Sequence, residues 1–339
     1  MKRESQVETR NASPVRYAIG IDHGQTNIRI GLVRNDGKIL KLVSKESPVL
    51  SMEDLTGAGE HMIPLIQKFV ALPEVADVKL DGIAVAIAGV ISREGVIVDS
   101  KHSKDPSWKG YDLRGLFQNK LDTDLPIIVE NDSKAATWGE YLFGAGRGLD
   151  HMICITVGTG IGGGLIFNRK MFHGRDGYAG LLGFVSVDRF GKRCPCGMLG
   201  CLNDYASGTD IGKNVRLLLE KGETSLLHEF VGDSYDDISS ELVFMAARKG
   251  DKLSSQVIWE AADAIGLAIA GLVHSLNPDL VVIGGGIAEQ GEFFIDRIRQ
   301  TMLENTINCY SNTPIIQTAL GDSAGTIGAA ALFWGENEV

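Results

Sequence analysis

The sequence predicts an α/β protein made of two similar domains, each a mixed sheet flanked by helices. The chain has 339 residues, more than one ordinary hydrophobic core accommodates, so two domains are expected. A succession of strand, glycine turn, strand, polar turn and strand occurs twice, with the copies about 135 residues apart. Further buried strands and a long amphipathic helix accompany these copies, as expected for sheets covered by helices.

The first copy begins at Tyr17. The segment "YAIGI" predicts a buried strand, and the alternation in "IRIGLV" predicts a second one. A hairpin turn at "RNDGK" leads to a third strand, "ILKLVS", because Asn, Asp and Gly favour such turns. Between the first two strands lies a glycine-containing turn, "DHGQT".

The second copy has the same order. A strand ends at Val157, a glycine turn follows in "GTGIGGG", and a strand at "GLIF", a polar turn at "NRK" and the dipeptide "MF" complete the copy. The repeated order predicts a duplicated domain.

Other segments supply the remaining strands and helices. Buried strands are predicted in "KLDGIAVAIAGVI" and "PDLVVIGGGIA". The segment "LPIIVENDSKAATWGE" predicts a strand ending at Val129 and a helix from Ser133. A long amphipathic helix is expected in "SQVIWEAADAIGLAIAGLVHSLNP", ended by Pro278.

These elements predict a division of the chain. Residues 1–15 are polar and lack periodicity, which predicts a disordered tail. Residues 16–133 together with 326–339 are expected to form an N-terminal α/β domain, because the final helix near "GAAALFWGE" should return to it. Residues 134–325 would then form a C-terminal α/β domain with a cysteine-rich loop, and a cleft would lie between the two domains.

Composition excludes several classes of partner. The formal net charge is −10 and no Lys/Arg-rich run occurs, which argues against nucleic acid or an anionic membrane. The longest apolar stretch, Ala261–Leu276, contains Asp263 and His274, and it is too short and too polar to span a bilayer. No secretory signal is recognised, and the five cysteines are odd in number with three of them bunched. A reducing cytoplasm is therefore expected, without a disulfide framework.

Three glycine turns follow buried strands. Such turns expose backbone N–H groups and form concavities that bind anions. A single turn of this kind is most simply a plain hairpin, but three of them predict a polyphosphate held between two domains. The segment "GTGIGG" also matches a dinucleotide-binding motif, yet a hairpin rather than a helix follows it, which excludes NAD binding. The Lys-Ser/Thr pair of a Walker A loop is missing as well.

Acidic and amide side chains lie at the junction of the strand ending at Val129 and the next helix: Glu130, Asn131 and Asp132. A carboxylate at this end of a strand can accept the proton of an attacking hydroxyl. Alternatively, Asp132 simply caps the helix. The spacing alone leaves both possibilities open.

Taken together, these segments resemble the ROK family of bacterial sugar kinases and sugar-responsive repressors. The resemblance rests on "GIDHGQTNIRIGLV", "VENDSKAATWGE", "TVGTGIGGGLI", "CPCGMLGCL", "LNPDLVVIGGGI" and "GDSAGTIGAAAL", in this order and over nearly the whole chain. It implies two duplicated actin-like (ribonuclease H-like) domains around a central cleft, a sugar acceptor and a homodimer. The repressors carry an N-terminal helix-turn-helix, which is not expected here because the first sheet strand begins near Tyr17.

The resemblance also implies roles for individual residues. Asp22, Gly24 and Thr26 would meet the ATP phosphates and Mg²⁺, although Gln25 stands where these kinases usually have glycine. Asn131 and Asp132 would hold the sugar, with Asp132 as the catalytic base. The second phosphate turn and the turn against the adenosine would contribute Gly158, Thr159, Gly160, Gly162, Gly284, Gly285 and Gly286.

The expected acceptor site departs from the family pattern. The family has G-E-x-G-H before its cysteine cluster and C-L-E after it, whereas this chain has "GLLGF" and "CLND". Leu181 and Asn203 thus replace two glutamates, and Phe184 replaces a histidine that also binds zinc. Because the three replaced side chains normally bind sugar hydroxyls, an altered acceptor is expected.

The cysteine loop lacks that histidine. We expect Zn²⁺ to bind through Cys194, Cys196 and Cys201, with water, His173 or Asp188 as the fourth ligand. The alternative is a loop held by packing, with the cysteines as small buried hydrophobes, but the tight spacing favours zinc. Cys154 and Cys309 are expected to be inert.

Two further residues near the expected site, His23 and Trp108, are expected to have no role in binding or catalysis. His23 lies in the first phosphate turn and is expected at the surface of that turn. Trp108 falls near the loop that would border the sugar, and a place in the core or at the rim is expected for it.

Two functional hypotheses follow: an ATP-dependent carbohydrate kinase with an altered acceptor, or a non-catalytic sugar- or nucleotide-binding sensor derived from such a kinase. An ATPase that acts on no sugar is a third, weaker hypothesis. The retained Asp132 favours the kinase, because decay would affect the base as readily as the hydroxyl-binding residues.

Overall fold

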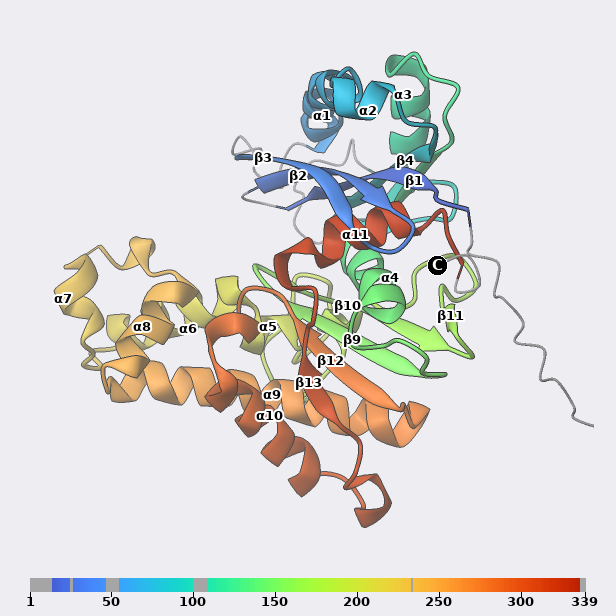
Figure 1. The fold of residues 1–339 in the computed structure, drawn as a ribbon. Coiled ribbons are helices and arrows are strands. Elements are labelled where there is room, and N and C mark those ends of the chain that lie inside the picture. Colours follow the sequence, from blue (N-terminus) through green and yellow to red (C-terminus); the bar gives the residue numbers. More distant parts are fainter. Residues whose placement is uncertain (1–13, 25–26, 47–54, 100–108, 233, 336–339) are drawn as a thin grey trace, which may run out of the picture.

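The computed structural model describes residues 14–24, 27–46, 55–99, 109–232 and 234–335. Thr26, Trp108 and most of the predicted N-terminal tail lie outside these ranges. The fold is a mixed α/β architecture, as the sequence predicts (Figure 1). The strands are β1 (Tyr17–His23), β2 (Asn27–Arg34), β3 (Ile39–Glu46), β4 (Leu80–Ile87), β5 (Val90–Ile91), β6 (Val96–Asp99), β7 (Tyr111–Asp112), β8 (Ile127–Asn131), β9 (Met152–Val157), β10 (Ile161–Phe167), β11 (Lys170–Met171), β12 (Leu280–Gly284) and β13 (Ile315–Gln317).

The helices and single turns complete the described part of the chain. The α-helices are α1 (Leu55–Val70), α2 (Pro73–Ala76), α3 (Leu113–Lys120), α4 (Asp132–Phe143), α5 (Asn203–Ala206), α6 (Gly208–Glu220), α7 (Leu227–Val231), α8 (Ser240–Arg248), α9 (Lys252–Leu276), α10 (Glu292–Glu304) and α11 (Ala324–Ala331). The 3₁₀ turns are η2 (Leu182–Phe184), η3 (Tyr235–Asp237), η4 (Ala288–Gln290), η5 (Asn308–Tyr310) and η6 (Gly321–Ser323).

Two five-stranded sheets have the same topology. The first sheet has the order β3-β2-β1-β4-β8 and the second has the order β11-β10-β9-β12-β13. In each sheet two antiparallel strands form a meander with the central strand, and two parallel strands continue on its other side. The predicted duplication is therefore confirmed at the level of the sheets. A third, three-stranded sheet consists of β5, β6 and β7.

The layers alternate between helices and sheets. In Figure 1, α1 and α3 cover the outer face of the first sheet, while α9 and α10 cover the outer face of the second. Between the sheets lie α4 and α11, which pack against each other. Helix α11 contacts β1 and α4 contacts β10, so the final helix returns to the first sheet as predicted. The predicted division of the chain at residues 133 and 326 stays a prediction.

Small residues permit the contact between α4 and α11. A Cβ atom on Gly328 would collide with the carbonyl oxygen of Ala135, so the two helix backbones approach each other closely there. Trp138 adds a hydrogen bond from its Nε1 to the carbonyl oxygen of Ala331 (2.9 Å). The two helices therefore form one tightly packed layer between the sheets.

Helix α9 begins three residues before the predicted "SQVIWE" segment, with Asp251 as its N-cap. It ends at Leu276, where Asn277 adopts a left-handed conformation one residue before Pro278. By length and mean hydropathy (1.5) it could cross a membrane, yet 61% of the apolar window is buried within the protein. Its buried side chains belong to the core between the second sheet and its outer helices, which identifies a core helix.

Candidate functional site

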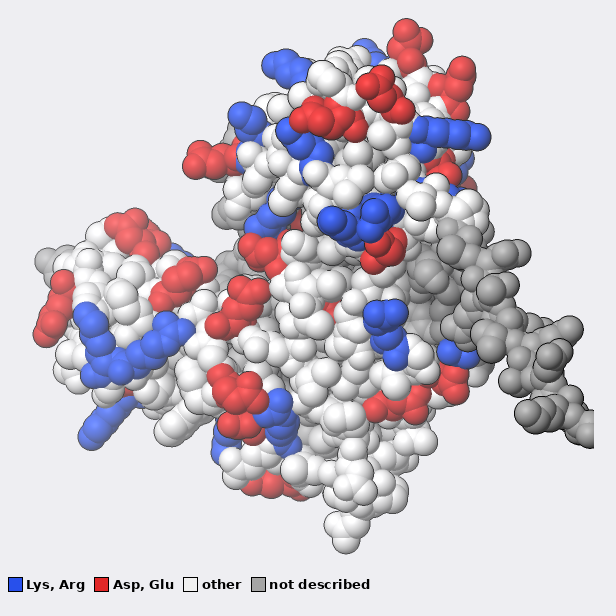
Figure 2. All heavy atoms as spheres, in the orientation of Figure 1, with Lys and Arg blue, Asp and Glu red and all other residues white. Residues whose placement is uncertain are grey.

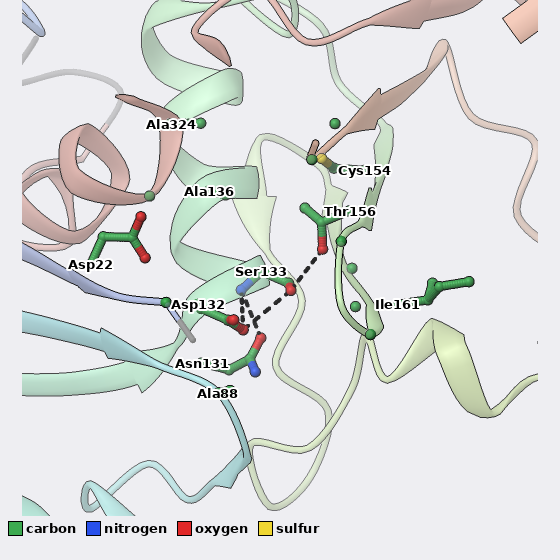
Figure 3. Close-up of a pocket in the computed structure, with 18 of the residues that line it drawn as sticks. Asp22, Ala88, Asn131, Asp132, Ser133, Ala136, Cys154, Thr156, Ile161 and Ala324 are labelled. Atoms are coloured by element: carbon green, nitrogen blue, oxygen red, sulfur yellow. Dashed lines mark hydrogen bonds between the residues drawn. The ribbon is translucent and has the colours of Figure 1, made fainter. Parts of the chain in front are cut away.

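A pocket of about 350 Å³ opens between the two sheets (Figure 3). Most of the residues that the sequence assigns to phosphate and sugar binding line it. They are Asp22, Gly24, Asn131, Asp132, Gly158, Thr159, Gly160, Gly162, Leu181, Phe184, Asn203, Gly284 and Gly285. Gly286 is not among the lining residues, Thr26 lies outside the described residues, and the three clustered cysteines lie outside the lining.

Strand pairing brings the first group together. Strands β1 and β8 both run parallel to β4, so their carboxyl ends meet at one edge of the first sheet. Asp22 pairs with Ala86, and the next residue of β4, Ile87, pairs with Asn131. Carboxyl ends of strands that face a cleft are the usual ligand-binding edge of such sheets.

Glycines in β10 let α4 approach the second sheet. The sequence predicts a turn over "GTGIGGG", but only Gly158–Gly160 form it, and Ile161–Gly164 already belong to β10. A Cβ atom on Gly162 would collide with the side chain of Ser133. The glycines therefore serve a close approach between strand and helix as well as a turn, and this approach places the first turn of α4 in the pocket.

Asn131, rather than Asp132, is the N-cap of α4. Its Oδ1 accepts hydrogen bonds from the backbone N–H groups of Ser133 and Lys134, both at 3.1 Å, and its Nδ2 donates to the carbonyl oxygen of Gly89. The possibility that Asp132 serves merely as the helix cap is therefore wrong, because the preceding residue fills that position. Asp132 is the first residue of the helix and lines the pocket.

A chain of hydroxyl groups orients Asp132. Its Oδ1 accepts hydrogen bonds from the backbone N–H of Ser133 (2.7 Å) and from the Ser133 hydroxyl (3.2 Å). The Thr156 hydroxyl of β9 donates in turn to Ser133 Oγ at 2.8 Å (Figure 3). The Asp132 carboxylate is thus held by Ser133 of the same helix, and Ser133 is held in turn by Thr156 of the second sheet.

Burial raises the pKa of two pocket carboxyls, those of Asp22 and Asp132. Burial raises the pKa of Asp132, while its hydrogen bonds with Ser133 oppose the rise. Burial is also the main cause that raises the pKa of Asp22 to about 7, and the charge of Asp132 adds to it, while Arg29 opposes it. The charge of Asp132 therefore disfavours ionisation of Asp22, and a divalent cation bound at Asp22 would relieve that repulsion.

The donor set fits Mg²⁺ and a polyphosphate. Carboxylate oxygens such as those of Asp22 are the ligands that Mg²⁺ prefers. Beside them the backbone at Gly158 is open, because a Cβ atom there would meet only the carbonyl oxygen of Gly160, at 4.0 Å. Gly285 has a positive φ of 87° and packs closely against the backbone of Val157. Open backbone such as that at Gly158 can cradle phosphate oxygens.

His23 is buried, contrary to the expectation of a surface turn residue. It is the last residue of β1, where it pairs with Ile28 on one side and Ile87 on the other. Only 7% of its surface is exposed, and burial lowers its pKa to about 4, so the ring is neutral at pH 7. The flanking strands, which the local sequence does not reveal, are the reason for this burial.

The expected acceptor side of the pocket is largely apolar. Leu181, the residue before η2, and Phe184, the last residue of η2, are both half-buried. Asn203 is 4% exposed, and its Oδ1 accepts a hydrogen bond from the backbone N–H of Ile161 at 2.7 Å. Its carbonyl oxygen is therefore occupied in anchoring β10.

The three predicted metal ligands do come together. The thiols of Cys194, Cys196 and Cys201 lie within 4.8 Å of one another, and the first and last are buried. Neither proposed fourth side chain joins them, which corrects that expectation. His173 instead contacts Glu130 (Nε2 to Oε2, 3.0 Å), and Asp188 accepts from the Tyr205 hydroxyl (3.1 Å). Among the described residues, three thiols form the whole cluster, so a fourth position would fall to water.

Several lining residues were missed by the sequence analysis. Glu140 is 1% exposed and binds the segment from Thr318 to Leu320, which borders the pocket. Helical spacing could have found it, because it lies two turns after Asp132 on the same face of α4. Arg29 was missed as well; its signal was its place opposite Asp22 in the β1–β2 hairpin.

Comparisons with known proteins agree on one family. The profile of the ROK family matches residues 18–336. A glucokinase from Thermotoga maritima is 34% identical over 316 residues, 93% of this chain and 96% of that protein. A xylose repressor from Caldicellulosiruptor bescii is 28% identical over 93% of this chain and 77% of its own length. A crystal structure of a ROK family glucokinase from Streptomyces griseus, in complex with glucose and AMPPNP, has a TM-score of 0.80 at 30% identity and covers 93% of this chain and 98% of its own.

Proposed function

Because the chain belongs to the ROK family, we propose that it is an ATP-dependent carbohydrate kinase with Asp132 as its base. It would transfer the γ-phosphate of ATP to a hydroxyl of a sugar or sugar-like acceptor. The observation that carries the proposal is the position of Asp132 in the pocket. Ser133 orients its carboxylate, and the N-cap of α4 is a different residue, Asn131. Because an oriented carboxylate could also hold a sugar hydroxyl in a sensor, turnover is the property that distinguishes the two functions.

The chain's own residues supply proton transfer and binding. Asp132 accepts the proton of the acceptor hydroxyl, and the raised pKa of this carboxyl makes it a better proton acceptor than an exposed aspartate. As the oxygen bonds to the γ-phosphorus, the bond to the leaving ADP oxygen breaks. Asp22 would bind Mg²⁺, and the turns at Gly24 and Gly158 would hold phosphate oxygens. MgATP, when bound, supplies the phosphoryl group.

The acceptor is expected to be less polar than glucose where it meets Leu181 and Phe184. A hydrogen bond to a charged group contributes roughly 1.5–3 kcal/mol. Without the two family carboxylates, a glucose-like substrate should lose roughly 3–6 kcal/mol, or about 10²- to 10⁴-fold in kcat/KM. A deoxy sugar, a substituted or glycosylated sugar, a ketose or a cyclic polyol would fit better.

A mixed charge distribution fits a small-molecule partner. On the face shown in Figure 2, Lys and Arg side chains are interspersed with Asp and Glu side chains. We therefore propose that the partner is a small molecule and that it is neither nucleic acid nor a membrane. We also propose a cytoplasmic location.

Consumption of ATP with and without a panel of sugars tests the proposal. We expect turnover with one of the less polar acceptors, poor turnover with glucose, mannose and N-acetylmannosamine, and little hydrolysis without acceptor. Asp132→Asn should lower kcat about 10²- to 10⁴-fold while Mg²⁺–nucleotide binding persists. The control is Asp150→Asn at an exposed position on the connection before β9, which should change neither.

Two results would contradict parts of the proposal. Nucleotide binding without turnover on any acceptor would favour the sensor. Phosphorylation of glucose with kcat/KM above roughly 10⁵ M⁻¹s⁻¹ would contradict the account of the acceptor site.

A further inference from the structure

The charges that line the pocket draw attention to Arg29. Arg29 is the only lysine or arginine among the described residues that line the pocket, and the buried His23 is neutral at pH 7. Acidic side chains outnumber it in the same lining: Asp22, Asp132, Glu140, Glu289 and Asp322. A polyphosphate entering this pocket would meet an excess of negative charge, so a single cation at the right place matters greatly.

Strand pairing fixes where Arg29 lies. In the antiparallel β1–β2 hairpin it stands directly opposite Asp22, so the two side chains share one face of the sheet. One guanidinium nitrogen, Nη1, is 3.9 Å from Asp22 Oδ2, and the other, Nη2, donates to Asp322 Oδ2 at 2.7 Å. The guanidinium therefore lies between the carboxylate expected to bind Mg²⁺ and a carboxylate of η6.

The partner on η6 is easily exchanged. The side chain of Asp322 is 72% exposed, whereas that of Arg29 is 24% exposed. An ion pair with so exposed a carboxylate contributes little, because water competes for it. A phosphate offers more oxygens and more charge to the same fork of N–H donors, and guanidinium binds it in bidentate fashion.

We propose that Arg29 is a phosphate-binding residue of the nucleotide site. When a nucleoside polyphosphate binds, the guanidinium releases Asp322 and contacts the phosphates beside Asp22, offsetting charge that Mg²⁺ leaves unbalanced. This inference rests on the proposed kinase function, since it requires a nucleotide in this pocket. The competing explanation is that the Arg29–Asp322 pair merely ties η6 to β2.

Calorimetry on three variants separates the two explanations. The probes are the non-hydrolysable ATP analogue AMPPNP with Mg²⁺, and adenosine, which lacks phosphates. Arg29→Met should weaken Mg²⁺–AMPPNP binding about 10- to 100-fold, the effect of one lost charged hydrogen-bonded contact, and should leave adenosine binding within about twofold. Arg29→Lys should restore part of the loss, because it returns the charge without the fork.

The matched variant is Asp322→Asn, which removes the same ion pair from its other side. Mg²⁺–AMPPNP should bind it as tightly as the wild type or more tightly, because a competitor for Arg29 is gone. If Asp322→Asn reproduces the loss seen in Arg29→Met, the pair acts as a structural tie and the proposal is overturned. Equal AMPPNP affinity in Arg29→Met and wild type, with both folded by circular dichroism, overturns it too. A wild type that binds no Mg²⁺–AMPPNP overturns the proposed function itself, which distinguishes that failure from the other two.

Discussion

At the scale of single side chains, Asp22 couples the pocket to pH. Its folded pKa of about 7 lies above the ordinary value of 3.8, mainly because of burial. Its contribution to stability is therefore fully present below about pH 4 and is lost as the pH rises through about 7. A shift of this size corresponds to a change on the order of 4 kcal/mol.

The variant Asp22→Asn isolates this effect. In EDTA, we expect its free energy of unfolding to be similar to that of the wild type at pH 4 and to exceed it increasingly up to pH 8. His23, whose lowered pKa removes stability as the pH falls from 6.5 towards 4, is present in both proteins and cancels in the difference. Urea titrations at several pH values provide the measurement. A difference that does not change with pH would show that Asp22 ionises normally in the folded protein.

At the scale of elements, the contact between α4 and α11 joins the two sheets. Because Gly328 faces the backbone of Ala135, Gly328→Ala must push the helices apart. We expect a loss of about 1–3 kcal/mol in stability, the usual cost of overpacking, seen as a lower urea midpoint. The control is Gly271→Ala in α9, where a Cβ atom meets open space and the better helix propensity should add up to about 1 kcal/mol. Equal effects of the two substitutions would show that helix propensity alone is at work.

The cysteine loop is a second element with a measurable property. With three thiols placed together, purified protein should contain about one zinc ion per chain, and Cys196→Ser should lose it. Cys309→Ser, at an exposed cysteine outside the cluster, should retain the metal. Elemental analysis by mass spectrometry makes the measurement. A metal-free protein of full thermal stability would instead favour a loop held by packing.

At the scale of the whole molecule, we expect a homodimer on the basis of the family resemblance. Light scattering at micromolar concentration should then give twice the chain mass of 36.5 kDa. Two large apolar side chains are exposed on α9, Trp259 at 54% and Leu267 at 41%, and burial of such groups is a usual driving force for association. A mass of 36.5 kDa under these conditions would contradict the expectation.

The sequence by itself determined the features that depend on neighbours along the chain. Alternation and buried apolar runs predicted β1, β2, β9 and β12, and the repeated order of strands and turns predicted two sheets of equal topology. The sequence also predicted that Asp132 lies at the junction of a strand and a helix. Such features follow from local preferences of strand, turn and helix, which a short window of sequence contains.

Only the tertiary structure decided features that depend on partners far away in the chain. His23 is buried because β4 flanks it as well as β2, and Arg29 lies in the pocket beside Asp322 of η6. Likewise Asn203 Oδ1 accepts a hydrogen bond from the backbone N–H of Ile161, and the His173 ring contacts Glu130 instead of the cysteines. Hydrogen bonds and strand register of this kind are satisfied between elements, so the type of a residue does not reveal which partner it finds.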